Sequence, residues 1–142
     1  MKALSTRGIA PPVAISQAIA AGLAPDGGLY MPEHWPTFSP ADFAGDETLA
    51  AVGKRLLAPF FADDAIGERL DAICDDAFAV TPPLRRFGTG DDFVLELFHG
   101  PTAAFKDYGA AFLAGCLGAL PRGEVPLTIV VATSGDTGAA AG

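Results

Sequence analysis

The sequence predicts an α/β protein with a small, mainly helical N-terminal domain and the beginning of a second domain built on a mostly parallel sheet. Up to about residue 80, apolar residues recur at helical spacing. From residue 81 onward, extended apolar segments alternate with a helical segment and a glycine-bearing loop, which is the βαβ pattern. We therefore expect two domains, over residues 1–80 and 81–142.

The N-terminal part contains three segments with the periodicity of helices. The first spans Val13–Leu23 and ends near Gly22, which suits a left-handed C-cap. A Pro-Asp-Gly-Gly turn and one short extended piece follow. The second helix is expected to begin at Asp46 as its N-cap, and the third at Asp63 or Asp64.

The second part contains three candidate strands and one long helix. Leu84–Phe87 and Phe93–Phe98 are short apolar strands, and a helix is predicted over Ala103–Leu120. Leu127–Ala132 is nearly all apolar and β-branched, which is typical of a strand covered on both faces. The next helix has barely one turn before Gly142, so we expect an incomplete sheet and a chain that is a fragment.

Composition excludes several classes of protein. Half of the residues are apolar, as in a soluble globular protein, and the net charge of −8 disfavours nucleic acid and anionic membranes as partners. The sequence has no membrane-spanning run and no recognisable signal peptide, so we expect a cytoplasmic protein. Cys74 and Cys116 stand alone at no metal-ligand spacing, and we expect both to be reduced, buried thiols.

Two loops follow predicted strands, at the sheet edge where α/β proteins bind ligands. The first contains Lys106, near a helix start and among small and aromatic residues. A helix N-terminus and an apolar setting both disfavour an ammonium ion, and a neutral amine is what a Schiff-base lysine requires. Spacing alone favours the alternative, a solvated surface lysine followed by an ordinary aspartate.

The second loop, Ser134–Gly138, leads into a helix. Its backbone N–H groups and hydroxyls could hold an anion, although Asp136 would repel one. The alternative is a tight strand-to-helix turn capped by Asp136 or Thr137. The loop does not match the Walker pattern, because no lysine follows its second glycine.

Four segments resemble threonine synthases. FHGPTAAFKDYGAAFL resembles the lysine motif of that family, and ATSGDTGAAA resembles its second motif. STRG at Ser5–Gly8 and GLAPDGGLYMP at Gly22–Pro32 resemble its N-terminal domain. The wider family of cysteine synthases and threonine dehydratases shares the lysine and a serine-glycine loop but lacks the GLAPDGGLY segment. That segment therefore favours threonine synthase.

The resemblance implies an enzyme that uses pyridoxal 5′-phosphate (PLP), with the fold-type II architecture of three αβα layers. Lys106 would bind PLP covalently. The substrate would be O-phospho-L-homoserine, and loss of phosphate followed by addition of water would give L-threonine. The glycine-rich loop that holds the cofactor phosphate in this family has no counterpart here, and we expect it elsewhere in the full-length protein.

The resemblance also assigns roles to the two loops. Lys106 is the expected catalytic residue, with no metal ligand beside it. Cofactor contacts are expected from Lys106, Phe105 and Asp136. Substrate contacts are expected from Ser134, Gly135, Thr137, Thr102 and His99. For His99, a loop histidine that only satisfies a backbone partner is an equal alternative.

Two other functions stay open at this point. The chain could be a non-catalytic threonine synthase-like remnant or binding domain, or part of another fold-type II PLP lyase. For the full-length enzyme we expect a small-molecule substrate and a monomer or weak dimer. We expect the 142-residue chain to be inactive alone.

Overall fold

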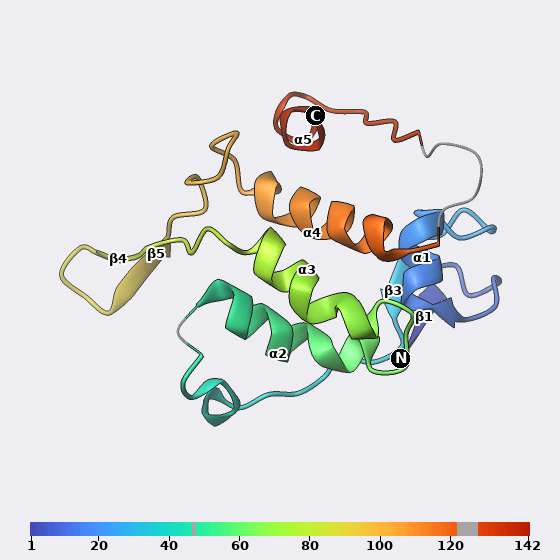
Figure 1. Ribbon diagram of the computed structural model, residues 1–142, viewed down its shortest axis with the longest axis horizontal. Coiled ribbons are helices and arrows are strands. Elements are labelled where there is room, and N and C mark those ends of the chain that lie inside the picture. Colours follow the sequence, from blue (N-terminus) through green and yellow to red (C-terminus); the bar gives the residue numbers. More distant parts are fainter. Residues whose placement is uncertain (47, 122–127) are drawn as a thin grey trace.

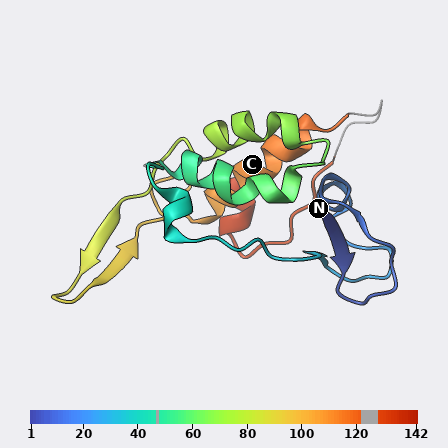
Figure 2. The same cartoon turned by 90° about the horizontal axis from the view of Figure 1, so that it is seen from below.

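Three packed helices occupy the middle of the molecule, between a small sheet at one end and a projecting hairpin at the other (Figures 1 and 2). The computed structural model describes residues 1–46, 48–121 and 128–142. Among the described residues, no helix is long and apolar enough to cross a membrane. The fold is mixed helix and strand, as the sequence predicts.

The N-terminal end is built on a three-stranded antiparallel sheet rather than on the single strand expected from the sequence. Its central strand is β1 (Lys2–Ser5), flanked by β2 (Val13–Ala14) and β3 (Tyr30–Pro32). Alternate residues of β1 are buried, including Ala3 and Ser5. Only one side of this short strand is buried, and the side chains on that side are small. The sequence of β1 therefore shows no clear apolar alternation.

A partly buried turn contacts the loop that follows β1. The Asp26 carboxylate accepts hydrogen bonds from the Ser5 hydroxyl at 2.7 Å and from the backbone N–H groups of Ala10 and Gly28, both at 2.9 Å. These donors, the Ser5 hydroxyl first, hold the pKa of the Asp26 carboxyl well below its usual range. Arg7 donates to the backbone oxygen of Asp26 at 2.9 Å. The two N-terminal segments that resemble threonine synthases therefore contact each other.

Helix α1 (Ile15–Ala21) follows β2 directly, so it is shorter than the helix predicted over Val13–Leu23. Gly22 is the C-cap residue, as predicted, but its ψ of −53° lies outside the left-handed helical conformation that was expected. Gly22 has φ 70°, and its N–H donates to the Ala18 carbonyl at 3.0 Å.

Helix α2 (Leu49–Phe61) begins after Thr48, whose side-chain oxygen accepts from the Ala51 N–H at 3.1 Å. The prediction of Asp46 as its N-cap is wrong. Asp46 lies too far before the helix and instead forms an ion pair with Arg55, with 2.5 Å between carboxylate oxygen and Nε.

Helix α3 (Leu70–Ala77) starts later than the sequence predicts, after a 3₁₀ turn at Gly67–Arg69. Asp64, one of the two predicted N-caps, accepts from the N–H groups of Ile66 at 3.0 Å and of Ser16 at 2.9 Å. Its carboxylate therefore ties α1 to the connection between α2 and α3 instead of opening a long helix.

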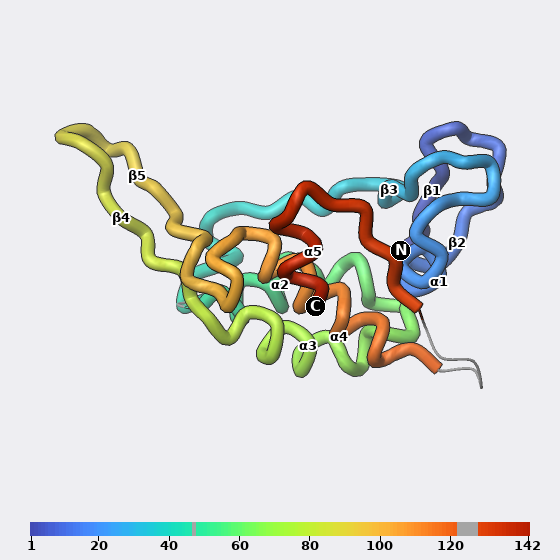
Figure 3. Tube along the Cα trace, turned by 90° about the horizontal axis from the view of Figure 1, so that it is seen from above, coloured from blue at the N-terminus to red at the C-terminus, as the bar shows by residue number. Residues whose placement is uncertain are grey.

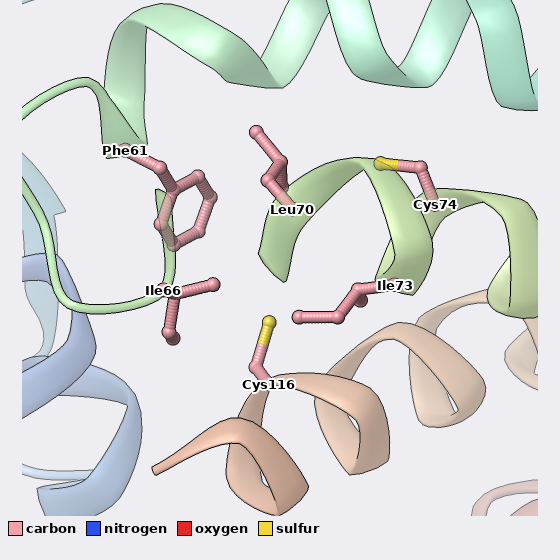
Figure 4. Packing of buried hydrophobic residues seen from close by; sticks show 6 residues of the cluster. All are labelled: Phe61, Ile66, Leu70, Ile73, Cys74 and Cys116. Atoms are coloured by element: carbon pink, nitrogen blue, oxygen red, sulfur yellow. The ribbon is translucent and has the colours of Figure 1, made fainter. Parts of the chain in front are cut away.

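The hydrophobic core lies where α2, α3 and α4 (Lys106–Ala119) meet (Figure 4). The helices approach closely because Gly115 faces Ile73, where an added Cβ would lie 2.8 Å from the isoleucine methyl carbon Cγ2. Phe78 and Phe112 stack beside the core with 5.8 Å between ring centroids. Buried members of the core are Phe61, Ile66, Leu70, Ile73, Cys74 and Cys116.

The second part of the chain does not form the expected sheet within the described residues. β4 (Leu84–Phe87) and β5 (Asp92–Leu95) pair with each other as an antiparallel hairpin with exposed side chains, and β5 ends before the predicted Phe98. All strand pairs of the described part are antiparallel. The hairpin projects from the helices (Figure 3).

The strand predicted over Leu127–Ala132 is also not observed. Residue 127 lies outside the described residues, and residues 128–132 form no strand. A strand must share its backbone hydrogen bonds with a neighbour, and no described strand lies beside this segment. The chain then enters α5 (Asp136–Ala141), which packs over α4 (Figures 1 and 3).

Candidate functional site: a lysine at the start of helix α4

Lys106 is the first residue of α4, which confirms its predicted place near a helix start. The helix was expected from Ala103, but that residue has φ 56°, a left-handed conformation that cannot continue into a helix. The Ala103 N–H donates to the Gly100 carbonyl at 3.1 Å, which closes a turn before the helix. The loop therefore bends sharply and delivers the lysine in the first helical turn.

The carboxylate next to the lysine is committed to the loop. Asp107 accepts from the Thr102 N–H at 2.9 Å and from the Thr102 hydroxyl at 2.5 Å. These bonds, the hydroxyl first, lower the pKa of the Asp107 carboxyl. Gly100 leaves room for this arrangement, because a Cβ there would lie 2.8 Å from Cβ of Asp107. Thr102, a predicted substrate contact, thus has its hydroxyl proton directed at Asp107.

The lysine amine lies over an aromatic ring. Its Nζ is 4.5 Å from the centroid of the Phe105 ring, the predicted cofactor contact. Within the part of the chain that the structure describes, Lys106 forms no ion pair and no side-chain hydrogen bond. A PLP-binding lysine must condense with the cofactor aldehyde, and no carboxylate of the described residues holds the amine of Lys106.

His99 lies on the same loop, and among the described residues its ring contacts side chains and no backbone group. Its Nε2 is 2.8 Å from Oε2 of Glu96, and its ring stacks on Phe98 with 4.7 Å between centroids. The Glu96 side chain is only 23% exposed. Sequence reasoning missed Glu96, although the Glu-x-x-His spacing at the end of a strand is a usable signal.

The second loop is closed on itself by a threonine that sequence reasoning also missed. The Thr133 hydroxyl oxygen accepts from the N–H groups of Gly135 at 3.0 Å and Gly138 at 3.1 Å. Neither of the caps considered from the sequence, Asp136 or Thr137, makes a side-chain capping bond. The N–H groups of Gly135 and Gly138, which could otherwise bind an anion, therefore already donate to Thr133.

The predicted residues of this second loop lie at the surface. Ser134, Gly135, Asp136 and Thr137 are all exposed, and Asp136 is the first residue of α5. Among the described residues, no hydrogen bond or ion pair joins them to Lys106. The lysine loop (residues 99–105, before α4) and the second loop (residues 134–138) are therefore not joined by a hydrogen bond or ion pair of these residues in the described part of the chain.

A cavity of about 410 Å³ lies between the lysine loop, α4 and α5. Its walls come from the end of α3, the lysine loop, α4 and α5, and alanine is the commonest residue among them. Thr102 and Asp107 line it, whereas Lys106, His99 and the loop residues 134–137 do not. The Tyr108 hydroxyl on its wall is buried and has no hydrogen-bond partner among the described residues.

Together, the fold and the site define a class of protein in which a small sheet-and-helix unit leads into a strand-loop-helix segment that carries a lysine at the helix start. Residues 2–78 match the family described as threonine synthase N terminus. Because this match covers more than half of the chain, the chain belongs to the threonine synthase N-terminal family.

Individual proteins agree with this assignment. A threonine synthase from Pseudomonas aeruginosa is 40% identical over 150 residues, covering 99% of this chain and 32% of the relative. The crystal structure of threonine synthase from Escherichia coli superposes with a TM-score of 0.80 at 33% identity, over 99% of this chain and 33% of that one.

A PLP-bound threonine synthase from Brucella melitensis superposes with a TM-score of 0.69 at 34% identity, over 83% of this chain and 28% of that one. The chain spans about a third of the length of the relatives that it matches.

Proposed function

We propose that the full-length protein carrying this sequence is a threonine synthase. It would convert O-phospho-L-homoserine and water to L-threonine and phosphate. The observation that carries this proposal is the position of Lys106, in the first turn of α4 and with its amine directed over Phe105 rather than at a carboxylate. The family match and the threonine synthase relatives support the same activity.

The residues around Lys106 fit PLP as the cofactor. The amine has the freedom to condense with the cofactor aldehyde, and the exposed Phe105 ring offers a flat apolar surface beside it. Bound PLP supplies an electron sink for chemistry at the substrate carbons. Lys106 would hold the cofactor and then move protons at those carbons, and Asp136 would orient the cofactor ring without transferring a proton.

Substrate binding is proposed for both loops. His99 and Thr102 lie on the lysine loop, and Ser134, Gly135 and Thr137 lie on the second loop. Their hydroxyl, amide and imidazole groups match the carboxylate and phosphate of phosphohomoserine. Because Thr133 occupies two amides of the second loop, substrate binding there would require the loop to exchange that partner.

The remaining proposals concern the whole protein. We propose a division at residue 80, an N-terminal domain followed by a fold-type II catalytic domain with three αβα layers and a mostly parallel sheet. The exposed apolar side chains of β4 and β5 support this, because such side chains normally pack against further structure. We also propose a cytoplasmic enzyme that is a monomer or weak dimer.

The experiment that tests the activity is a comparison of substrates. Purified full-length protein with PLP should release phosphate from O-phospho-L-homoserine and form threonine, and the Lys106→Ala variant should not. Serine, threonine and O-acetylserine serve as competing substrates. Turnover of one of these instead would indicate another PLP lyase, and turnover of none would favour a non-catalytic binding protein.

A further inference from the structure

We propose that Glu96 is a positioning residue that acts through His99 and prepares its ring for the substrate. This inference rests on the proposed function, in which His99 contacts the substrate. Its physical basis is the contact between the two side chains, with 2.8 Å between Nε2 of His99 and Oε2 of Glu96.

Glu96 is itself fixed by the hairpin. It follows β5 directly, and its N–H donates to the Pro83 carbonyl at 3.0 Å, which extends the pairing of β4 and β5 by one step. Its second carboxylate oxygen, Oε1, lies 3.9 Å from Nε of Arg85 on β4. One oxygen therefore points back to the hairpin and the other points forward to the lysine loop.

Two contacts hold the His99 ring. The Glu96 carboxylate contacts Nε2 at one edge of the His99 ring. The Phe98 ring stacks on one face of the His99 ring at an interplanar angle of 27°. Nδ1 is the ring nitrogen that remains without a hydrogen bond in the described part of the chain. In the neutral ring that donates from Nε2, Nδ1 is an acceptor, and in the imidazolium both nitrogens donate. Glu96 thus determines which ring atom is free for a ligand.

The energetic consequence is a pre-ordered side chain. A histidine on a loop ordinarily samples several rotamers, and a substrate must pay for ordering the ring when it binds. Here the hairpin, through Glu96, orders it beforehand. If Glu96 only stabilised the loop, its removal would affect stability alone. If Glu96 positions His99, its removal changes catalysis only while His99 is present.

The first test is structural and does not depend on turnover. In the 142-residue chain labelled with ¹⁵N-histidine, the Nε2–H proton of His99 should exchange with water more slowly than the ring protons of His34. His34 is the matched control because its side chain is 65% exposed and its Nδ1 lies 3.9 Å from Glu33. Glu96→Ala should remove the difference. Equal exchange in the unmodified chain would overturn the proposal.

The second test is a double-mutant cycle in the full-length protein, measured as kcat/KM for phosphohomoserine. Glu96→Ala should lower it about tenfold when His99 is present and less than twofold in the His99→Gln background. Glu96→Gln should recover most of the loss, because the amide oxygen still accepts from Nε2–H. Asp91→Asn, which removes another carboxylate of the hairpin, should stay within about twofold of the unmodified protein.

Equal losses in both His99 backgrounds, or no loss with Glu96→Ala, would overturn the proposal. Should Glu96→Ala fail to fold, the exchange measurement on the unmodified chain still decides whether the contact exists. Absence of phosphate release by unmodified full-length protein would contradict the proposed function instead, and it would leave the exchange result standing.

Discussion

Thr102 donates to the Asp107 carboxylate twice, once through its backbone N–H and once through its hydroxyl. These two bonds hold the carboxylate to the loop, and in the described part of the chain no ion pair joins it to the adjacent Lys106. The proposed cofactor-binding lysine therefore has as its neighbour an aspartate that already accepts from other donors.

Gly100→Ala should disrupt this contact, since the new Cβ would overlap the Asp107 side chain. We expect the free energy of unfolding of the 142-residue chain to fall by about 1–3 kcal/mol. Gly109→Ala is the matched control within α4, where nothing lies within 4 Å of an added Cβ, and it should stabilise by about 0.5–1 kcal/mol. Denaturant unfolding measures both, and equal effects would contradict the proposed role of Gly100.

Asp26→Asn should change how stability depends on pH. The lowered pKa of Asp26 in the folded chain means that its contribution is fully present above the unfolded value of about 4, and it is lost as pH falls through the lower folded value. The free energy of unfolding of the unmodified chain should therefore decrease between pH 5 and pH 2.

The Asn variant should be less stable at pH 7, since its amide cannot satisfy all the donors around it, and it should lose less stability in acid. Asp91→Asn, whose side chain is exposed, is the control. An Asp26→Asn profile parallel to that of the unmodified chain would show that this carboxylate does not stabilise the N-terminal turn.

Ile66→Ala should be among the most damaging core substitutions, because this side chain is fully buried where α2, α3 and α4 meet (Figure 4). We expect a loss of about 2–5 kcal/mol in the free energy of unfolding. Ile9→Ala is the matched control, since Ile9 is 81% exposed, and it should change stability by less than about 0.5 kcal/mol. Similar denaturation midpoints for the two variants would contradict the described core.

Cys74 and Cys116 should react slowly with alkylating reagents. Burial raises the pKa of both thiols to about 11, so only roughly one thiol in a thousand is a thiolate at pH 8. Alkylation in the folded chain should be far slower than in denaturant and should increase with pH. Rapid labelling of the native chain at pH 8 would show that these thiols are accessible.

Helices were predictable here because their apolar spacing is a local property of the chain. The core-forming side chains of α2, α3 and α4 stand at helical intervals in the sequence, and the helices are found close to their predicted places. Their ends were less predictable, because an end depends on which partner a capping side chain finds. Asp46 forms an ion pair with Arg55, and the Asp64 carboxylate accepts from the backbone N–H groups of Ser16 and Ile66.

Strands were harder, since a strand exists only with a neighbour. β1 pairs with residues that lie ten or more positions away in the sequence, which no local pattern indicates. The apolar segment at 128–132 has the composition of a strand but no strand beside it among the described residues. For the candidate site, the sequence motif predicts Lys106 and His99, whereas the roles considered for Glu96 and Thr133 come from their contacts in the structure.

The attachment point of the cofactor decides whether Lys106 is the PLP-binding lysine. Full-length protein should be incubated with PLP, reduced with borohydride and digested, and the labelled peptide identified by mass spectrometry. We expect the label on Lys106, and we expect Lys106→Ala to abolish both the label and the visible absorbance of bound PLP. A label on Lys2 or Lys54, or one that persists in Lys106→Ala, would contradict it.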